Sequence, residues 1–174
     1  MKKSILLITI LSLSTLSMAQ RADHKAALYQ LIEDFRTSTI EHDNPEKFYN
    51  LFLNENITWS AIYTGKSKLN IEKKRPGFST YDSNIKKFYT YLSDGMEERF
   101  YNIEIEVRND FATVSFDYSF LKGGDIQNWG TEYWSVLLVN DQWKITSVTW
   151  SMNMQNVEPC PFAEMEHFTL NQSR

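Results

Sequence analysis

Glu132 is the residue whose neighbours in the sequence most resemble the surroundings of a catalytic acid. It lies in the segment NWGTEYWSVLLVNDQWKITSVTWSMN, residues 128–153, which contains four of the five tryptophans. A carboxyl group surrounded by apolar aromatic side chains has a raised pKa and can exchange protons near neutral pH. Two alternatives follow for Glu132: a general acid in an apolar pocket, or a structural carboxylate on one face of a strand.

Two further carboxylates are candidates for the same role. Asp34 follows Glu33 in a predicted first helix and precedes Phe35, so it would lie near the mouth of a pocket covered by that helix. Asp117 lies in the alternating segment ATVSFDYSF. For both residues the alternative is a solvated carboxylate without a catalytic role.

Other kinds of chemistry have little support in the sequence. His24, His42 and His167 are isolated, and no pair of them has the spacing of metal ligands. There is no glycine-rich phosphate loop and no G-x-S-x-G elbow. We therefore expect neither a metal nor a cofactor.

The N-terminal segment predicts export. Lys2 and Lys3 precede an apolar stretch, and Ser17-Met18-Ala19 is typical of a cleavage site before Gln20, so residues 1–19 are predicted to be a signal peptide. The protein would then be periplasmic or secreted and would not contact the membrane after cleavage. Residues 20–154 would form one domain, and residues 155–174 a C-terminal tail.

The charge and the cysteine content exclude other classes. The 174 residues have a net charge of −4, and removal of the two lysines in the signal peptide makes the remainder more acidic, which argues against nucleic acid as a partner. Cys160 is the only cysteine, so no internal disulfide can form.

Three helices and an antiparallel sheet are predicted around the candidate residues. Residues 22–40 have apolar positions at helical spacing, Asn44-Pro45 begins a short second helix, and Asp82 is predicted to cap a third. Residues 57–63 form a strand, and the cationic segment 66–75 is interpreted as a loop. Four alternating strands follow, at about 98–108, 111–121, 126–140 and 142–153, separated by Asn109-Asp110, Gly123-Gly124 and Asn140-Asp141. This is an α+β domain with helices on one face of a curved sheet.

Two-residue turns between these strands predict which side chains share a face. One face becomes apolar and aromatic, and the helices should cover it. This aromatic face, together with residues of the strand 57–63, is predicted to form a ligand pocket. Its lining residues would be Trp59, Tyr63, Tyr101, Phe116, Tyr118, Trp129, Thr131, Tyr133, Trp150 and Met152.

The opposite face is then predicted to carry Glu132 and Asp117. Farther along the strands, this face becomes apolar at Val136, Leu138, Trp143 and Ile145, which we interpret as a homodimer surface. A β-bulge near Gly123-Gly124 would exchange the two faces of the last strands and turn Glu132 into the pocket.

The order of the elements and the closing pattern W-K-I-x-x-V-x-W-S, residues 143–151, resemble the nuclear-transport-factor-2-like superfamily. This group includes SnoaL-like polyketide cyclases, ketosteroid isomerases, scytalone dehydratase and many uncharacterised exported bacterial proteins. The resemblance covers residues 23–153. It implies a cone-shaped fold with a pocket between helices and sheet, and pairing of two chains through the outer face of the sheet.

The resemblance carries over little of the catalytic machinery of these enzymes. Ketosteroid isomerases have a carboxylate base where this chain has Ser60-Ala61, and a tyrosine donor where it has Phe35. Many SnoaL-like proteins have a histidine at the position of Thr149, whereas the pocket tryptophan is retained as Trp150. Two functions are therefore expected: binding of a small hydrophobic molecule, with lyase or isomerase chemistry as an extension, or a non-catalytic dimerising module with a filled pocket.

Overall fold

The computed structural model describes the backbone of residues 3–170 and the side chains of residues 22–170. The predicted signal peptide, residues 1–19, with its cleavage site at Ala19-Gln20, lies outside the residues whose side chains are described, and export stays a prediction. Within the described part of the chain, no helix has both the length and the apolar character needed to cross a membrane.

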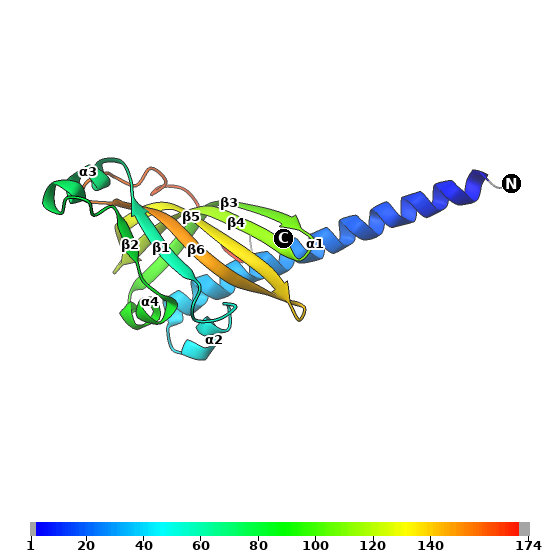
Figure 1. Ribbon diagram of the computed structural model, residues 1–174, viewed down its shortest axis with the longest axis horizontal. Helices are drawn as coiled ribbons and strands as arrows, with labels where there is room; N and C mark the ends of the chain where they lie inside the picture. The colour runs from blue at the N-terminus through cyan, green and yellow to red at the C-terminus, as the bar shows by residue number, and fades with distance from the viewer. Residues whose placement is uncertain (1–2, 171–174) are drawn as a thin grey trace.

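The protein is an α+β domain in which helices pack on one face of a curved sheet (Figure 1). The six strands have the order β2-β1-β6-β5-β4-β3, and all neighbours are antiparallel except β1 and β6. The elements are α1 (Lys3–Glu41), α2 (Pro45–Tyr49), β1 (Thr58–Tyr63), α3 (Gly65–Lys74), β2 (Thr80–Asp82), α4 (Ile85–Tyr91), β3 (Met96–Arg108), β4 (Phe111–Lys122), β5 (Asp125–Val139) and β6 (Gln142–Met154).

The sequence signals for helix starts are correct at α2 and displaced elsewhere. Asn44 caps α2 by accepting a hydrogen bond from the Lys47 amide, with Pro45 at the first helical position. The cap of α4 is Asn84, not Asp82. The cationic segment 66–75 was predicted as a loop; most of it is the helix α3, whose Ser67 is buried and accepts a hydrogen bond from the Met154 amide.

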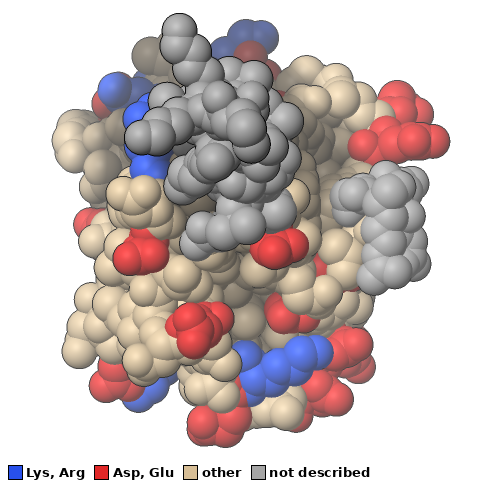
Figure 2. All heavy atoms as spheres, turned by 90° about the vertical axis from the view of Figure 1, so that its right-hand side faces the viewer, with Lys and Arg blue, Asp and Glu red and all other residues tan. Residues whose placement is uncertain are grey.

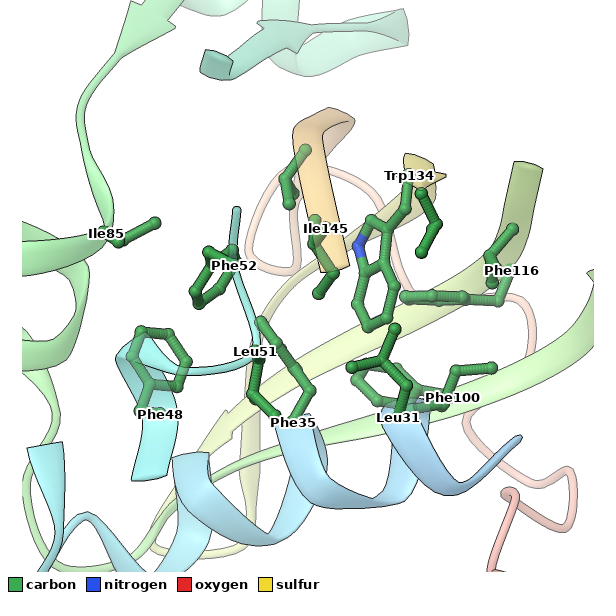
Figure 3. Close-up of a cluster of buried hydrophobic side chains, with 14 of the residues drawn as sticks. Leu31, Phe35, Phe48, Leu51, Phe52, Ile85, Phe100, Phe116, Trp134 and Ile145 are labelled. Atoms are coloured by element: carbon green, nitrogen blue, oxygen red, sulfur yellow. The ribbon is translucent and has the colours of Figure 1, made fainter. Parts of the chain in front are cut away.

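The core lies between the helices and the concave face of the sheet. Phe35 of α1 is central to it, with ring centroids 5.0 Å from Trp134 of β5 and 5.6 Å from Phe48 of α2. Figure 3 shows Leu31 and Phe35 rising from α1 toward Phe100, Phe116 and Trp134 on the strands. Burial of these large side chains fixes the position of α1 across the sheet.

The pairing of β3 with β4 agrees with the predicted register only near their turn. Val107 faces Ala112 and Ile105 faces Val114, as expected. Between Tyr101 and Glu104 the register shifts, and Asn102 adopts a left-handed conformation with φ +50°. Tyr101 therefore faces Asp117 instead of Tyr118, and it lies on the outer face of the sheet.

A second bulge reverses the predicted faces of β5. The turn at Gly123-Gly124 has two residues, because Lys122 faces Asp125, but Gln127 is inserted between the pairs Leu121–Ile126 and Phe120–Asn128. From this point every side chain of β5 faces opposite to the prediction. Glu132 thus points into the concave face, whereas Trp129, Thr131 and Tyr133 point outward.

A third bulge, at Thr146, follows the correctly predicted turn at Asn140-Asp141. It restores the expected inward orientation of Val148, Trp150 and Met152. The four residues predicted to form an outer dimer surface lie instead in the helix-covered core or pack against it, so that assignment is wrong: Val136, Leu138, Trp143 and Ile145. Homodimer formation itself stays a prediction.

The convex face is partly covered by the segment that follows β6. Cys160 and Phe162 pack on Tyr101 and Trp129, and the Trp129 indole Nε1 donates a hydrogen bond of 2.8 Å to the Glu158 carbonyl. Aromatic residues on both faces of the sheet are therefore buried, one set by the helices and one by this segment. Charged groups on the face shown in Figure 2 are mainly carboxylates, as the net charge of −4 implies.

Gly130 allows β5 and β6 to approach closely beside the cavity described below. A Cβ atom at this position would lie 2.0 Å from the Ser151 carbonyl oxygen. The Ser151 hydroxyl accepts a hydrogen bond from the Thr131 amide, and its carbonyl accepts one from the Tyr118 hydroxyl. Any side chain at position 130 would separate these groups.

We predict that Gly130→Ala lowers the free energy of unfolding by about 3 kcal/mol, because the added methyl group overlaps backbone atoms that cannot move independently. Chemical denaturation followed by circular dichroism measures this change. Ser135→Ala, an outward position of the same strand, is the control and should change stability by less than about 0.5 kcal/mol. Equal stability of the two variants would contradict the close approach.

Candidate functional site

A cavity of about 250 Å³ lies between α1, α4 and the concave face of the sheet. Aromatic rings and methionines form most of its wall, and the polar groups that reach it are two carboxylates, an amide and tyrosine hydroxyls. The lining residues are Phe35, Trp59, Tyr63, Tyr81, Phe88, Tyr91, Glu98, Tyr118, Phe120, Asn128, Glu132, Trp150, Met152 and Met154.

Glu132 reaches this wall from the middle of β5. Its neighbours across the strands are Phe116 on β4 and Trp150 on β6, and only 4% of the residue is exposed. The indole Nε1 of Trp134 donates a hydrogen bond of 2.5 Å to one carboxyl oxygen, Oε1. Glu132 and Trp134 are successive inward residues of β5, so the donor and the acceptor are held side by side. The hydrogen bond therefore fixes the orientation of the carboxyl group.

Glu98 is a second buried carboxylate, on the inner face of β3, and the sequence interpretation missed it. Its flanking inward residues are Met96 and Phe100, so the alternation M-x-E-x-F in strand β3 was the available signal. Glu98 is 6% exposed, and its Oε2 atom has no hydrogen-bond partner in the described part of the protein. An unpartnered buried oxygen on a cavity wall is available to a ligand.

Burial raises the pKa of both carboxyl groups. Desolvation raises the pKa of Glu132 to about 7, and the hydrogen bond from Trp134 opposes this shift. Desolvation, followed by the negative charge of Glu132, raises the pKa of Glu98 well above its ordinary value. The carboxyl group of Glu132 can therefore exchange protons near neutral pH, and burial favours the neutral form of Glu98.

Tyr118 and Asn128 form the polar part of the wall near the two acids. The single proton of the Tyr118 hydroxyl is shared between two acceptors, Asn128 Oδ1 at 3.0 Å and the Ser151 carbonyl oxygen at 3.1 Å. Burial and then the charges of Glu132 and Glu98 raise the Tyr118 pKa well above its ordinary value, so this phenol stays neutral. Tyr118 is therefore a neutral polar group of the cavity wall and not a base.

The residues predicted to line a pocket divide into three groups. Trp59, Tyr63, Tyr118, Trp150 and Met152 line the cavity. Phe116 lies in the core beneath it. The remaining four are on the convex face because of the bulges in β3 and β5, and their assignment to the pocket wall is corrected: Tyr101, Trp129, Thr131 and Tyr133.

The other two carboxylate candidates lie away from the cavity. Asp34 accepts a hydrogen bond from Gln30 and borders a different hollow, beside Leu51 and Trp143. Asp117 lies on the convex face, as predicted, and accepts hydrogen bonds of 2.8 Å from Asn102 and Thr131. Among the residues that the structure describes, no group of three or more His, Cys, Asp or Glu side chains is arranged to hold a metal ion.

No family model matches the sequence, and no curated protein sequence matches it. Solved structures are similar at low identity. A nuclear transport factor 2-like protein with a cystatin-like fold from Novosphingobium aromaticivorans has a TM-score of 0.57 and 12% identity, over 86% of this chain and 92% of that one. A protein of the same organism, provisionally named a scytalone dehydratase, has a TM-score of 0.55 and 17% identity, over 79% and 89%.

A nuclear transport factor 2-like protein of unknown function from Silicibacter pomeroyi is similar over 76% of this chain and 98% of its own, with a TM-score of 0.55 and 17% identity. This chain has the nuclear transport factor 2-like fold. The fold explains why helices and sheet enclose a cavity, and the resemblance in the sequence pointed to the correct architecture. At these identities the similarity describes the backbone only, and the chemistry must come from the cavity itself.

The raised pKa of Glu132 predicts an unusual dependence of stability on pH. Between pH 4.5, the ordinary value, and about 7, the folded protein holds a proton that the unfolded chain has released. The free energy of unfolding should therefore fall as the pH rises through this interval, by about 3 kcal/mol from Glu132 alone. Burial also raises the pKa of Glu98, so this residue contributes a fall of the same sign.

Glu132→Gln should remove most of the fall below pH 7, because the amide oxygen still accepts from Trp134 and the side chain cannot ionise. Denaturation of wild type and variant at pH 5, 7 and 8 measures this difference. Glu104→Gln, an exposed residue of β3, is the control and should follow the wild-type curve. A wild-type stability that rises from pH 5 to pH 7 would refute the burial of these acids in neutral form.

Proposed function

We propose that the protein binds a small, mainly apolar molecule in this cavity and transfers a proton on it, as an isomerase or a lyase does. The observation that carries the proposal is the pair Glu98–Glu132, two buried carboxyl groups on one aromatic cavity wall, whose pKa values burial raises. A group that titrates near 7 is suited to act as a base at neutral pH, and a group that stays protonated is suited to donate.

The surroundings of the two acids support different roles for them. Glu132 is oriented through Oε1 by Trp134 and is partly ionised, so it is the general base. Burial favours the protonated form of Glu98, and its Oε2 atom has no partner among the described residues, so it donates a hydrogen bond to a carbonyl or hydroxyl oxygen of the ligand. The reaction begins when Glu132 removes a proton from carbon while Glu98 stabilises the oxygen that gains negative charge.

The cavity also bears on the alternative of a non-catalytic module. That function requires a cone filled by its own side chains, whereas a volume of about 250 Å³ remains between them. Ionisable groups that are buried without a counter-charge destabilise a fold, and a purely structural wall would be more stable with apolar residues at both positions. These two features support a ligand site with proton-transfer chemistry.

Proton transfer can be tested without knowledge of the natural substrate. We use 2-tetralone, a flat neutral ketone, in D₂O and follow loss of its α-protons by NMR. Glu132 accepts a proton from carbon, exchanges it with solvent and returns a deuteron. We expect wild type to accelerate exchange over buffer, Glu132→Gln to lose about 100-fold of that acceleration, and Glu98→Gln to lose a smaller part.

Glu104→Gln is the control for this experiment, because it removes a carboxylate from the convex face of β3 and should keep the full rate. Wild-type exchange no faster than buffer, or exchange unaffected by Glu132→Gln, would refute the proposed proton transfer. Circular dichroism of each variant establishes that the fold is retained.

Trp134 should act as a positioning residue for the base. Its hydrogen bond lowers the pKa of Glu132, so Trp134→Phe should raise that pKa and move the midpoint of the pH–rate profile for 2-tetralone exchange to higher pH. Trp143→Phe makes the same truncation at a buried indole whose Nε1 has no partner among the described residues. It should leave the midpoint unchanged, and a common shift in both variants would contradict a specific role for Trp134.

A further inference from the structure

We infer that the ligand of this cavity is a hydrophobic organic cation, an amine or quaternary ammonium compound whose positive charge lies against the aromatic wall that Trp59 and Trp150 form, near the carboxyl group of Glu132. The inference rests on the proposed use of the cavity as a ligand site and adds the charge of the ligand. It starts from a charge imbalance in the wall.

The cavity wall contains two acidic side chains and no basic side chain. Glu98 and Glu132 reach it from β3 and β5, and none of its lining residues is Lys, Arg or His. Neither acid takes part in an ion pair of the described side chains, and Oε2 of Glu98 lacks any partner. A buried carboxylate that cannot reach a cation of its own chain is stabilised by a cation that a ligand brings.

Aromatic rings beside Glu132 provide a second contact for the same charge. Trp150 is the direct neighbour of Glu132 across the β5–β6 pair, and its ring centroid is 5.7 Å from that of Trp59, at an interplanar angle of 67°. The ring centroid of Tyr81 lies 6.4 Å from that of Trp150, also at an interplanar angle of 67°. The face of an aromatic ring carries negative partial charge, so ring faces exposed to the cavity attract an ammonium group.

The remaining charged and titratable groups around the cavity do not supply a counter-charge. The other lining groups that titrate are the phenols of Tyr63, Tyr81, Tyr91 and Tyr118, from β1, β2, α4 and β4, while the contributions of α1 and β6 are apolar or aromatic. Burial raises the pKa of Tyr63, and the positive charge of Arg75 opposes this shift, but Arg75 itself is exposed and stacks on Phe78. The lysines of α3 do not line the cavity.

Charge on the ligand would also prepare the base. A positive charge beside Glu132 favours its ionised form, so binding should release the proton that is held near neutral pH. A cationic ligand thereby increases the fraction of protein in which Glu132 can accept a proton. A neutral ligand of equal shape would fill the cavity without this effect.

Two probes of nearly identical shape isolate the charge: benzyltrimethylammonium and its neutral carbon analogue neopentylbenzene. Binding is followed by the fluorescence of the tryptophans, two of which line the cavity. At pH 8 we expect the cation to bind about tenfold more tightly than the neutral analogue. The preference should shrink toward pH 5, and calorimetry in buffers of different ionisation enthalpy should detect proton release near pH 7.

Variants test which residues cause the preference for the cation. Glu132→Gln and Trp150→Leu should each reduce it to about threefold or less, while Glu104→Gln and Tyr133→Leu, matched changes on the convex face, should retain it. Equal or tighter binding of neopentylbenzene, or a preference that survives Glu132→Gln, overturns the inference and leaves the proposed function standing. If neither probe binds while 2-tetralone still exchanges its protons, the inference also fails. Absence of both binding and exchange refutes the inference and the proposed function together.

Discussion

One additional residue in β5, Gln127, decides which side chains of this strand face the helices. Because side chains alternate along a strand, a single insertion exchanges the faces of every residue that follows it. In this protein the insertion turns Glu132 and Trp134 toward α1 and Tyr133 toward solvent. The hydrogen bond between the two inward residues, the carboxyl pair and the polar wall around Tyr118 all depend on that exchange.

The strands also have to curve for these groups to meet. Bulges at Asn102, Gln127 and Thr146 bend three of the four long strands, and Gly130 lets β6 approach β5 closely. Curvature produced in this way leaves a volume under the sheet that α1 and α4 do not fill.

The cavity combines two features that oppose each other in a purely structural core. Its aromatic wall excludes water, and this desolvation raises the free energy of any ionised group within it. Glu98 and Glu132 are nevertheless placed there without a counter-charge, so the folded state loses stability as they ionise. A cavity that keeps two such acids has carboxyl groups with raised pKa values and favours a ligand that compensates their charge.

Composition, turn residues and periodicity determined the fold class, the short helix after Asn44, the two-residue turns and the existence of an aromatic face in this sheet. These are local properties, since capping, turn conformation and alternation involve residues close together in the chain. The sequence also indicated Glu132 as a candidate acid. A bulge near Gly123-Gly124 was the predicted alternative that would turn this residue inward.

Only the tertiary structure decided which side chains of each strand face the helices and which face outward. Both faces of β5 carry large apolar residues, because the helices cover one face and the segment around Phe162 covers part of the other, so periodicity could not distinguish them. A bulge forms where packing across the whole sheet outweighs a local loss of pairing, and that balance is set by residues far apart in the chain. The partnership of Glu98 with Glu132 depends on the same long-range packing, since the two belong to strands separated by β4.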